Sequence, residues 1–360
     1  MKIFFTPGPS QRYPTLAQHI QSALELNVPE ISHRSQFFKD YFAFTVRELK
    51  KLMGIPDDFS ILFHTSATEI WERLLQNCVV KHSQHYVNGS FSERFFKAAG
   101  SLQLEAIAGQ AKWGSGFHFD ATSVPQEMEM INFTHNETST GFMLPLEKIY
   151  PFRSTHPNAL LTLDMVSSAP YGNPDWNKID AAYFSVQKSF GLPAGLGVLI
   201  AGPRIFEKAL EKEAKGKSIG TYRNFLKMRD KFLVHQTLET PNMLGIYLLG
   251  KVCADMNATG IDKIREKTEE KYEKLVTFIE KQPSFEFFVK DPAIRSKTVI
   301  IVDFPEGAQA MIQYLDKKGL VVGNGYGPFK GKQIRVANFP AITTENMDQL
   351  IAAMADFSKA

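Results

Sequence analysis

The sequence is poor in cysteine, in net charge and in long apolar runs. Its 360 residues include two cysteines, Cys78 and Cys253, which lie far apart in apolar surroundings and argue against a disulfide framework or a cysteine metal site. A net charge of +3 is too small to indicate a nucleic-acid partner. No apolar run approaches the roughly 18 residues of a membrane span. A proline comes too early in MKIFFTPGPS for a signal peptide, so we expect a soluble cytoplasmic protein with no metal and no membrane partner.

The sequence contains enough hydrophobic residues to form a large core. Hydrophobic residues make up 44% and charged residues 22%, an ordinary globular balance. At roughly 100–200 residues per domain, the length predicts two domains. The residue pattern changes after Gly260. A long, highly charged amphipathic helix is predicted there, and strand-like runs follow at 285–289 and 298–304. We predict a large domain over residues 1–257 and a smaller C-terminal α/β domain over residues 258–360.

Three apolar runs of strand length stand in a row between residues 160 and 201. LLTLD ends at Asp164, AAYFSVQK ends at Lys188, and GLGVLIA follows a Gly-Leu-Pro turn. Short apolar runs between turn signals are typical of buried strands, and strand ends border the ligand crevice of open α/β sheets. A lysine out of water can attack a carbonyl, and pyridoxal phosphate held this way needs an acid opposite its ring nitrogen. Asp164 and Lys188 fit these roles; the alternative is a helix-capping aspartate and a lysine on a solvated loop.

A strand, a turn of small residues and an amphipathic helix follow one another from Ile61 onward. Backbone N–H groups at the start of such a helix can cradle a phosphate. The segment lacks a Walker pattern, which argues against a nucleotide P-loop. We therefore expect Ser66, Ala67 and Thr68 to bind a phosphate group.

A second anion site is predicted at His33 and Arg34, just ahead of a long helix. Ser32 or Ser35 can cap this helix, which should turn Phe37, Tyr41, Phe44, Val46 and Leu49 toward a core. An arginine at a helix start combines fixed donors with the helix dipole. The alternative is an ordinary surface arginine near a cap.

The segments around Lys188 (SVQKSFG) and Asp164 (DMVSS) resemble those of the class V, fold-type I pyridoxal-phosphate aminotransferases. The opening FFTPGP is similar to the F-x-P-G-P segment that lines the active site in this class. The resemblance implies a mainly parallel, mixed sheet in a large domain, with a smaller C-terminal domain. It also implies that Lys188 carries the cofactor, that Asp164 faces its pyridine nitrogen, and that Gln187 contacts its phosphate.

Further motifs extend the resemblance along the chain. The small turn at Ser66, Ala67 and Thr68 resembles the cofactor-phosphate turn of the class. Phe91, in N-G-x-aromatic-S-E-R, matches the aromatic that stacks on the pyridine ring, although a core phenylalanine is the alternative. Thr138, in N-E-T-x-x-G, matches the residue that bonds the phenolic oxygen. TPNMLGIY resembles a segment that reaches the cofactor of the neighbouring subunit, which implies a homodimer and makes Asn242 the candidate.

Two arginines connect the chain with one branch of the class, the phosphoserine aminotransferases. His33 and Arg34 match an H-R-S motif that serves the substrate phosphate, and Arg335 matches a loose R-x-S/N-x-x-x-P motif that holds the α-carboxylate. There are departures: Thr68 stands where some members carry an arginine, and Ala337 stands where a serine or asparagine is usual.

The implied reaction converts glutamate and 3-phosphohydroxypyruvate to 2-oxoglutarate and O-phosphoserine, a step of serine biosynthesis. Lys188 would then also move the proton between Cα and C4′. One rival is a class V enzyme of the alanine–glyoxylate type, whose substrate has no phosphate. Another is a catalytically silent binding protein on the same fold, against which an intact Lys188 and Asp164 argue.

Overall fold

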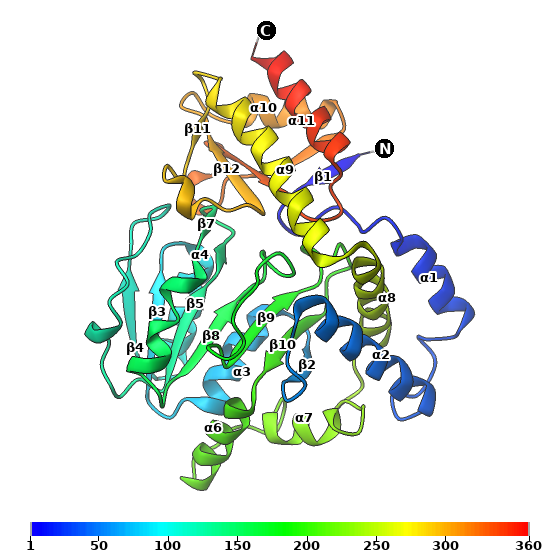
Figure 1. Ribbon diagram of the computed structural model, residues 1–360, viewed down its shortest axis with the longest axis vertical. Coiled ribbons are helices and arrows are strands. Elements are labelled where there is room, and N and C mark those ends of the chain that lie inside the picture. Colours follow the sequence, from blue (N-terminus) through cyan, green and yellow to red (C-terminus); the bar gives the residue numbers. More distant parts are fainter. Residues whose placement is uncertain (1, 359–360) are drawn as a thin grey trace.

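The computed structural model describes residues 2–358 and is built around two β-sheets (Figure 1). The larger sheet lies in the half of the molecule away from both termini. Its strands, in spatial order, are β2 (Ser60–His64), β10 (Gly197–Ala201), β9 (Ala181–Ser185), β8 (Leu160–Asp164), β5 (Met130–Thr134), β3 (His82–Val87) and β4 (Glu105–Gln110). Strand β10 is antiparallel to both neighbours, and the pairings from β9 to β4 are parallel. The predicted α/β fold with a mainly parallel, mixed sheet is confirmed.

Alternate side chains of the larger sheet point to opposite faces, as the two-residue period of a strand requires. In β2, Leu62 packs on one face, and Ile61 and Phe63 pack on the other. The Leu62 face is covered by helices α3 (Ala67–Cys78), α4 (Ser90–Ser101), α6 (Pro203–Ala214) and α7 (Phe225–Phe232). The other face is covered by helices α1 (Leu16–Glu25), α2 (Gln36–Met53), α5 (Pro151–Thr155) and α8 (Met243–Thr259). Burial on both faces explains why β2, β5, β8, β9 and β10 are mostly apolar.

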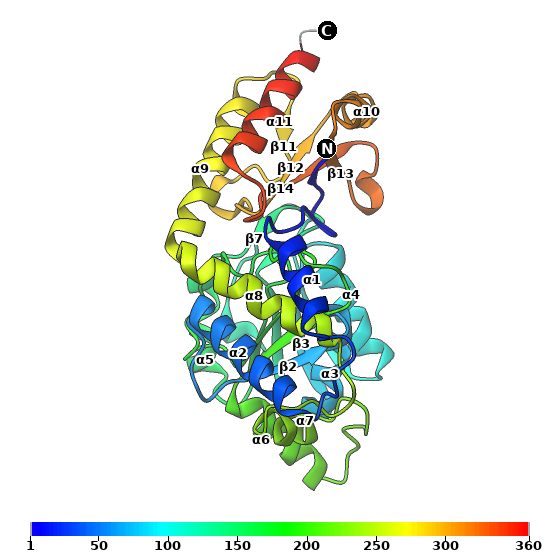
Figure 2. The ribbon, with the colours of Figure 1, turned by 90° about the vertical axis from the view of Figure 1, so that its right-hand side faces the viewer.

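The smaller sheet lies beside the chain termini (Figures 1 and 2). Its strands, in spatial order, are β1 (Ile3–Phe5), β13 (Leu320–Asn324), β14 (Gln333–Ala337), β12 (Val299–Asp303) and β11 (Glu286–Phe287). Its apolar side chains form one buried cluster with helices α9 (Ile261–Glu280), α10 (Gln309–Lys317) and α11 (Thr344–Phe357). Strand β1, from the start of the chain, pairs in parallel with β13 in this sheet. The boundary near residue 257 stays a prediction, but the first strand crosses to the C-terminal sheet.

The helix expected after Ser32 or Ser35 begins at Gln36, and Ser35 is its N-cap. Ser35 Oγ accepts a hydrogen bond from the Phe38 N–H at 3.1 Å. The predicted inward position of Phe37 is wrong: Phe37 is 38% exposed, whereas Phe38 is fully buried. Since successive residues of a helix are about 100° apart, an error of one residue moves a side chain from the core to solvent.

Both cysteines are buried and unpaired, Cys78 in α3 and Cys253 in α8, as their apolar surroundings predict. Within residues 2–358, no helix combines the length and the apolar character that a membrane crossing requires. A short hairpin of β6 (Asn136–Glu137) and β7 (Phe142–Met143) follows the end of β5 and borders the region described next.

Candidate active site

The carboxyl ends of the parallel strands meet at one edge of the larger sheet, and several of the predicted site residues lie there. Asp164 is the last residue of β8, and Lys188 lies in the turn that follows β9. Both side chains are buried, at 5% and 9% exposure. Because ligands of such sheets bind at this edge, the positions agree with the prediction that both residues face a ligand crevice.

Lys188 lies beneath the opening segment of the chain. A Cβ atom on Gly8 would come within 2.6 Å of Lys188 Cε, and Gly8 has a φ of +147°, so only glycine fits this position. Ser10 holds the segment in place, because its N–H donates to the Gln187 carbonyl at 3.1 Å and its hydroxyl to the Lys188 carbonyl at 2.6 Å. The opening segment therefore covers the lysine, as the F-x-P-G-P resemblance implies.

The charge state of Lys188 is set by its surroundings. Its pKa is lowered to about 8, chiefly by burial and then by the charge of Arg335, against the opposing charges of Asp164 and Glu137. Its Nζ lies 5.7 Å from the centre of the Phe91 ring. A lysine with a lowered pKa is more often the neutral amine at physiological pH, the form that attacks carbonyl carbons.

Asp164 is held in one orientation by a donor on each carboxylate oxygen. Oδ1 accepts from the Val166 N–H at 2.9 Å, and Oδ2 accepts from the Trp71 indole at 3.2 Å. Burial raises the pKa of Asp164 to about 6, against the effect of these hydrogen bonds. The sequence analysis missed Trp71, since its contact joins α3 to β8 across 93 residues. A cationic ring nitrogen opposite Asp164 would relieve the cost of its buried charge.

The predicted phosphate turn lies at the N-terminus of α3. Ser66 caps the helix by accepting from the Glu69 N–H at 3.2 Å, and the Ala67 N–H donates to Ser185 Oγ at 2.9 Å. Within residues 2–358, the N–H groups of Ser66 and Thr68 have no acceptor. Unpartnered N–H groups at a helix start fit an anion, so the turn suits the phosphate of the implied cofactor.

Phe91, Thr138 and Gln187 also lie at this edge. Phe91 is in the first turn of α4 over Lys188, and Thr138 Oγ1 donates to Ser167 Oγ at 2.7 Å, next to the Asp164 strand end. Gln187 is half-buried beside Lys188. The buried Ser189 Oγ has no partner in the described part of the chain, which leaves a hydroxyl for a ligand. These polar groups fit a cofactor with several oxygen atoms.

Glu137 is a site residue that the sequence analysis did not identify. It is fully buried, and its carboxylate accepts from the N–H and the hydroxyl of Ser92, both at 2.9 Å, and from the Ser139 hydroxyl at 2.6 Å. These bonds fix the start of α4, and therefore Phe91, relative to the end of β5. The N-E-T motif contained Glu137, but only Thr138 was singled out from it.

Arg335 reaches the site from the smaller sheet. Its Nε donates to the Asn324 carbonyl at 2.7 Å, and burial lowers the pKa of its guanidinium to about 10. The guanidinium lies 5.3 Å from the centre of the Tyr326 ring, which in turn lies 5.3 Å from the Phe91 ring. We call Asp164, Lys188, Phe91 and Arg335 the Lys188 group. Tyr326 was missed, although its setting between Gly325 and Gly327 marks a tight turn.

His33, Arg34 and Asn242, which we call the outer group, lie elsewhere. Arg34 and Asn242 are exposed, and His33 Nδ1 is 3.4 Å from Thr240 Oγ1. Asn242 caps α8 by accepting from the Gly245 N–H at 2.8 Å, and its amide donates to the Gly195 carbonyl at 3.1 Å. Within residues 2–358, His33 and Arg34 make no hydrogen bond or ion pair with the Lys188 group. The structure therefore brings His33 close to the segment of Asn242.

Comparison with known proteins identifies the family of the chain. A family model described as Aminotransferase class-V matches residues 3–329. The chain therefore belongs to the class-V aminotransferase family, and the predictions of this family and of an enzyme are confirmed.

Within the family, the relatives point to one branch. The phosphoserine aminotransferase of Nocardioides sp. is 28% identical over 323 residues, covering 89% of this chain and 86% of its own. A crystal structure of a phosphoserine aminotransferase, SerC, from Cytophaga hutchinsonii is 47% identical, covers 99% of this chain and 98% of its own, and has a TM-score of 0.97. A pyridoxal-phosphate-bound phosphoserine aminotransferase from Trichomonas vaginalis is 18% identical, covers 99% of this chain and 100% of its own, and with a TM-score of 0.82 shares the fold.

Proposed function

We propose that this protein transfers an amino group from glutamate to 3-phosphohydroxypyruvate, with pyridoxal phosphate as cofactor. The products are 2-oxoglutarate and O-phosphoserine, which places the reaction in serine biosynthesis. The observation that carries the proposal is the buried Lys188, with a pKa lowered to about 8, beside the buried Asp164. The relatives named above support the choice of substrate.

The bound cofactor supplies an electron sink for a substrate carbanion. In the proposal, Lys188 Nζ holds the cofactor and then moves a proton at the substrate Cα. Asp164 keeps the pyridine nitrogen protonated through its negative charge. Phe91 keeps the ring plane in place, and Thr138 and Gln187 bind the oxygen atoms of the ring and the phosphate. The turn at Ser66, Ala67 and Thr68 binds the cofactor phosphate through backbone N–H groups.

Two arginines have separate tasks in the proposal. Arg335 binds the α-carboxylate that both substrates share, because it is buried, charged and within electrostatic reach of Lys188. His33 and Arg34 bind the substrate phosphate. The exposed position of Arg34 and Asn242 in one chain supports a homodimer in which they, and His33, act in the site of the partner subunit. Two buried, unpaired cysteines support a reducing, cytoplasmic location.

The test compares two amino acceptors, with glutamate as donor and the purified protein loaded with pyridoxal phosphate. We expect 3-phosphohydroxypyruvate to be used with a higher kcat/KM than glyoxylate. A preference for glyoxylate would favour the alanine–glyoxylate type, for which Thr68 in place of an arginine is the supporting observation. The absence of cofactor absorbance from the loaded protein would favour a silent binding protein.

A further inference from the structure

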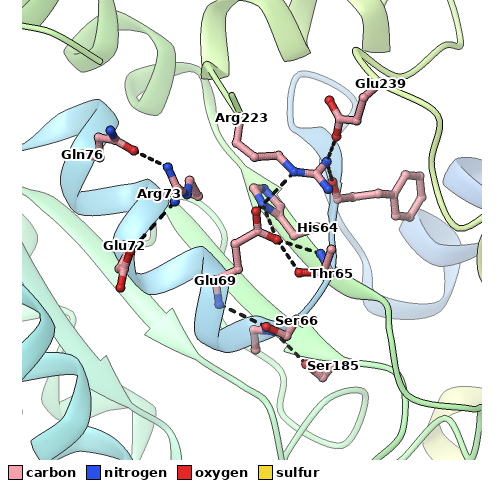
Figure 3. A network of polar contacts seen from close by, with 12 residues as sticks. His64, Thr65, Ser66, Glu69, Glu72, Arg73, Gln76, Ser185, Arg223 and Glu239 are labelled. Atoms are coloured by element: carbon pink, nitrogen blue, oxygen red, sulfur yellow. Dashed lines mark hydrogen bonds and ion pairs between the residues drawn. The ribbon is translucent and has the colours of Figure 1, made fainter. Parts of the chain in front are cut away.

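Arg223 is the centre of a buried polar network on the α3 side of the site (Figure 3). Its side chain is nearly buried, at 6% residue exposure, and its Nη1 donates to the Phe63 carbonyl at 2.8 Å. It forms ion pairs with two carboxylates, Glu69 at 3.3 Å and Glu239. Arg223 also adopts a φ of +57°, which is uncommon for a residue other than glycine. The network thus joins β2, α3 and the segment before α8.

Each carboxylate of this network borders a segment of the proposed cofactor-phosphate site. Glu69 lies in the first turn of α3, and its Oε2 accepts from the N–H and the hydroxyl of Thr65, both at 2.8 Å. Figure 3 shows Glu69 between Arg223 and the capping Ser66. Glu239 directly precedes Thr240, which contacts His33, and lies three residues before Asn242. One negative charge therefore lies in the turn that would receive a phosphate, and a second lies on the other side of Arg223.

Unpaired carboxylates near a phosphate would weaken its binding, because like charges repel strongly where water is scarce. The hydrogen bonds of Glu69, in spite of partial burial, hold its pKa well below its ordinary value, so it stays ionised. His64 lies 3.8 Å from Glu69 and also lowers the pKa of that carboxyl, but Arg223 lies closer to Glu69, at 3.3 Å. Arg223 is thus the cation paired with both acids.

We propose that Arg223 is a positioning residue for the cofactor phosphate. By pairing with Glu69 and Glu239 it offsets one of their two negative charges and holds the β2–α3 turn against the segment of Asn242. The proposal rests on the proposed function, because it takes the turn at Ser66–Thr68 to be the phosphate site. A purely structural arginine would stabilise the fold without favouring a phosphorylated ligand.

The experiment compares the Kd of pyridoxal phosphate with that of pyridoxal, which lacks the phosphate, by titrating the cofactor-free protein and following absorbance. In Arg223→Met, we expect pyridoxal phosphate to bind at least about tenfold more weakly, the scale of one lost charged interaction, and pyridoxal to change less than about twofold. Equal losses for both ligands, or no loss for either, would overturn the proposal.

A second variant serves if Arg223→Met does not fold. Glu239→Gln removes one flanking charge and leaves Arg223 in place, so pyridoxal phosphate should bind several-fold more tightly while pyridoxal is unaffected. Unchanged binding of pyridoxal phosphate by this variant would contradict the proposal. In the double variant Arg223→Met/Glu239→Gln, a large part of the lost affinity should return.

Arg153→Met is the matched control. Arg153 forms an ion pair with the buried Asp180, which precedes β9 and so lies at the opposite edge of the same sheet from Lys188. Its loss should lower stability and leave the ratio of the two Kd values unchanged. If the unaltered protein binds pyridoxal as tightly as pyridoxal phosphate, the turn does not bind the cofactor phosphate and the proposed function fails there. If the unaltered protein prefers pyridoxal phosphate and only the Arg223 variant loses this preference, both the phosphate site and the role of Arg223 are supported.

Discussion

The Lys188 group and the outer group differ in how much of their environment one chain supplies. Lys188 and Asp164 are buried, and their pKa values are shifted by burial and by neighbouring charges, among them, for Lys188, that of Arg335 from the smaller sheet. Arg34 and Asn242 are exposed, and His33 has one weak side-chain contact. One chain thus supplies the surroundings of the first group. In the second group, Asn242 caps a helix, and His33 Nε2 has no hydrogen-bond partner within residues 2–358. This is what we expect of residues that act in the site of a neighbouring subunit.

The largest expected effect is on Lys188. In Lys188→Ala, the cofactor should no longer be fixed by borohydride, and turnover should fall by at least about 10²–10⁴-fold, the scale of one lost proton-transfer group. Mass analysis of the reduced protein locates the label. The matched control is Lys271→Met, since Lys271 is also buried with a pKa lowered to about 8 but bonds to the Phe339 and Ile342 carbonyls. A label that survives on another lysine would contradict the assignment.

Asp164→Asn should have the next largest effect. The change keeps the shape and the contact with Trp71 but removes the charge that favours a protonated ring nitrogen. We expect turnover to fall by roughly 10²-fold or more, with cofactor still bound, as measured by kcat and by absorbance. Asp180→Asn is the control, because this buried acid lies at the opposite sheet edge. Near-normal turnover in Asp164→Asn would rule out the proposed role.

Variants of Arg335, in the Lys188 group, and of Arg34, in the outer group, should differ in which substrate they affect. Arg335→Ala should weaken both glutamate and the phosphorylated keto acid by about ten- to a hundredfold in kcat/KM, since each carries an α-carboxylate. Arg34→Ala should weaken only the phosphorylated substrate, by a similar factor. Single half-reactions followed by absorbance measure each substrate separately, and Arg47→Ala, an exposed arginine in α2, is the control. An equal loss for both substrates in Arg34→Ala would make that arginine structural.

The smallest effect concerns the stability of the cofactor-free protein. Asp164 has an ordinary pKa of 3.8 and a raised pKa of about 6 in the folded chain, so the folded state binds the proton more tightly. Its contribution to the free energy of unfolding is present below pH 3.8 and is lost as the pH rises through about 6. Urea unfolding should show the unaltered protein losing up to roughly 3 kcal/mol relative to Asp164→Asn across this range. A constant difference would show that the folded-state pKa is not raised.

Local patterns predicted most of the large sheet and the residues at its edge. Buried strands ending near Asp164 and Lys188 follow from short apolar runs between turns, and the helix after Ser66 follows from an amphipathic pattern behind a turn of small residues. The resemblance added Phe91 and Arg335, which the structure places near Lys188. The roles of these residues remain predictions.

Some features could not be read from local patterns. Strand β4 is an exposed edge strand of mixed polarity, so it lacks an apolar run that would mark it as a strand. In α2, the helical period did not decide whether Phe37 or Phe38 faces the core. Glu137, Trp71 and Tyr326 were missed because their importance lies in contacts with distant segments.

The sequence by itself determined the class of fold and the two residues at the centre of the site, because strand periodicity, turn residues and the order of motifs are local properties of the chain. Only the tertiary structure decided that β1 joins the C-terminal sheet, that Arg335 lowers the pKa of Lys188, and that Arg223 pairs with Glu69 and Glu239. The pairings of β1 with β13, Arg335 with Lys188 and Arg223 with Glu69 join residues 147 to 317 positions apart. Arg223 and Glu239 are closer in the sequence, but their two loop segments meet only through packing. Burial and electrostatic energy depend on such distances in space, which no local pattern records.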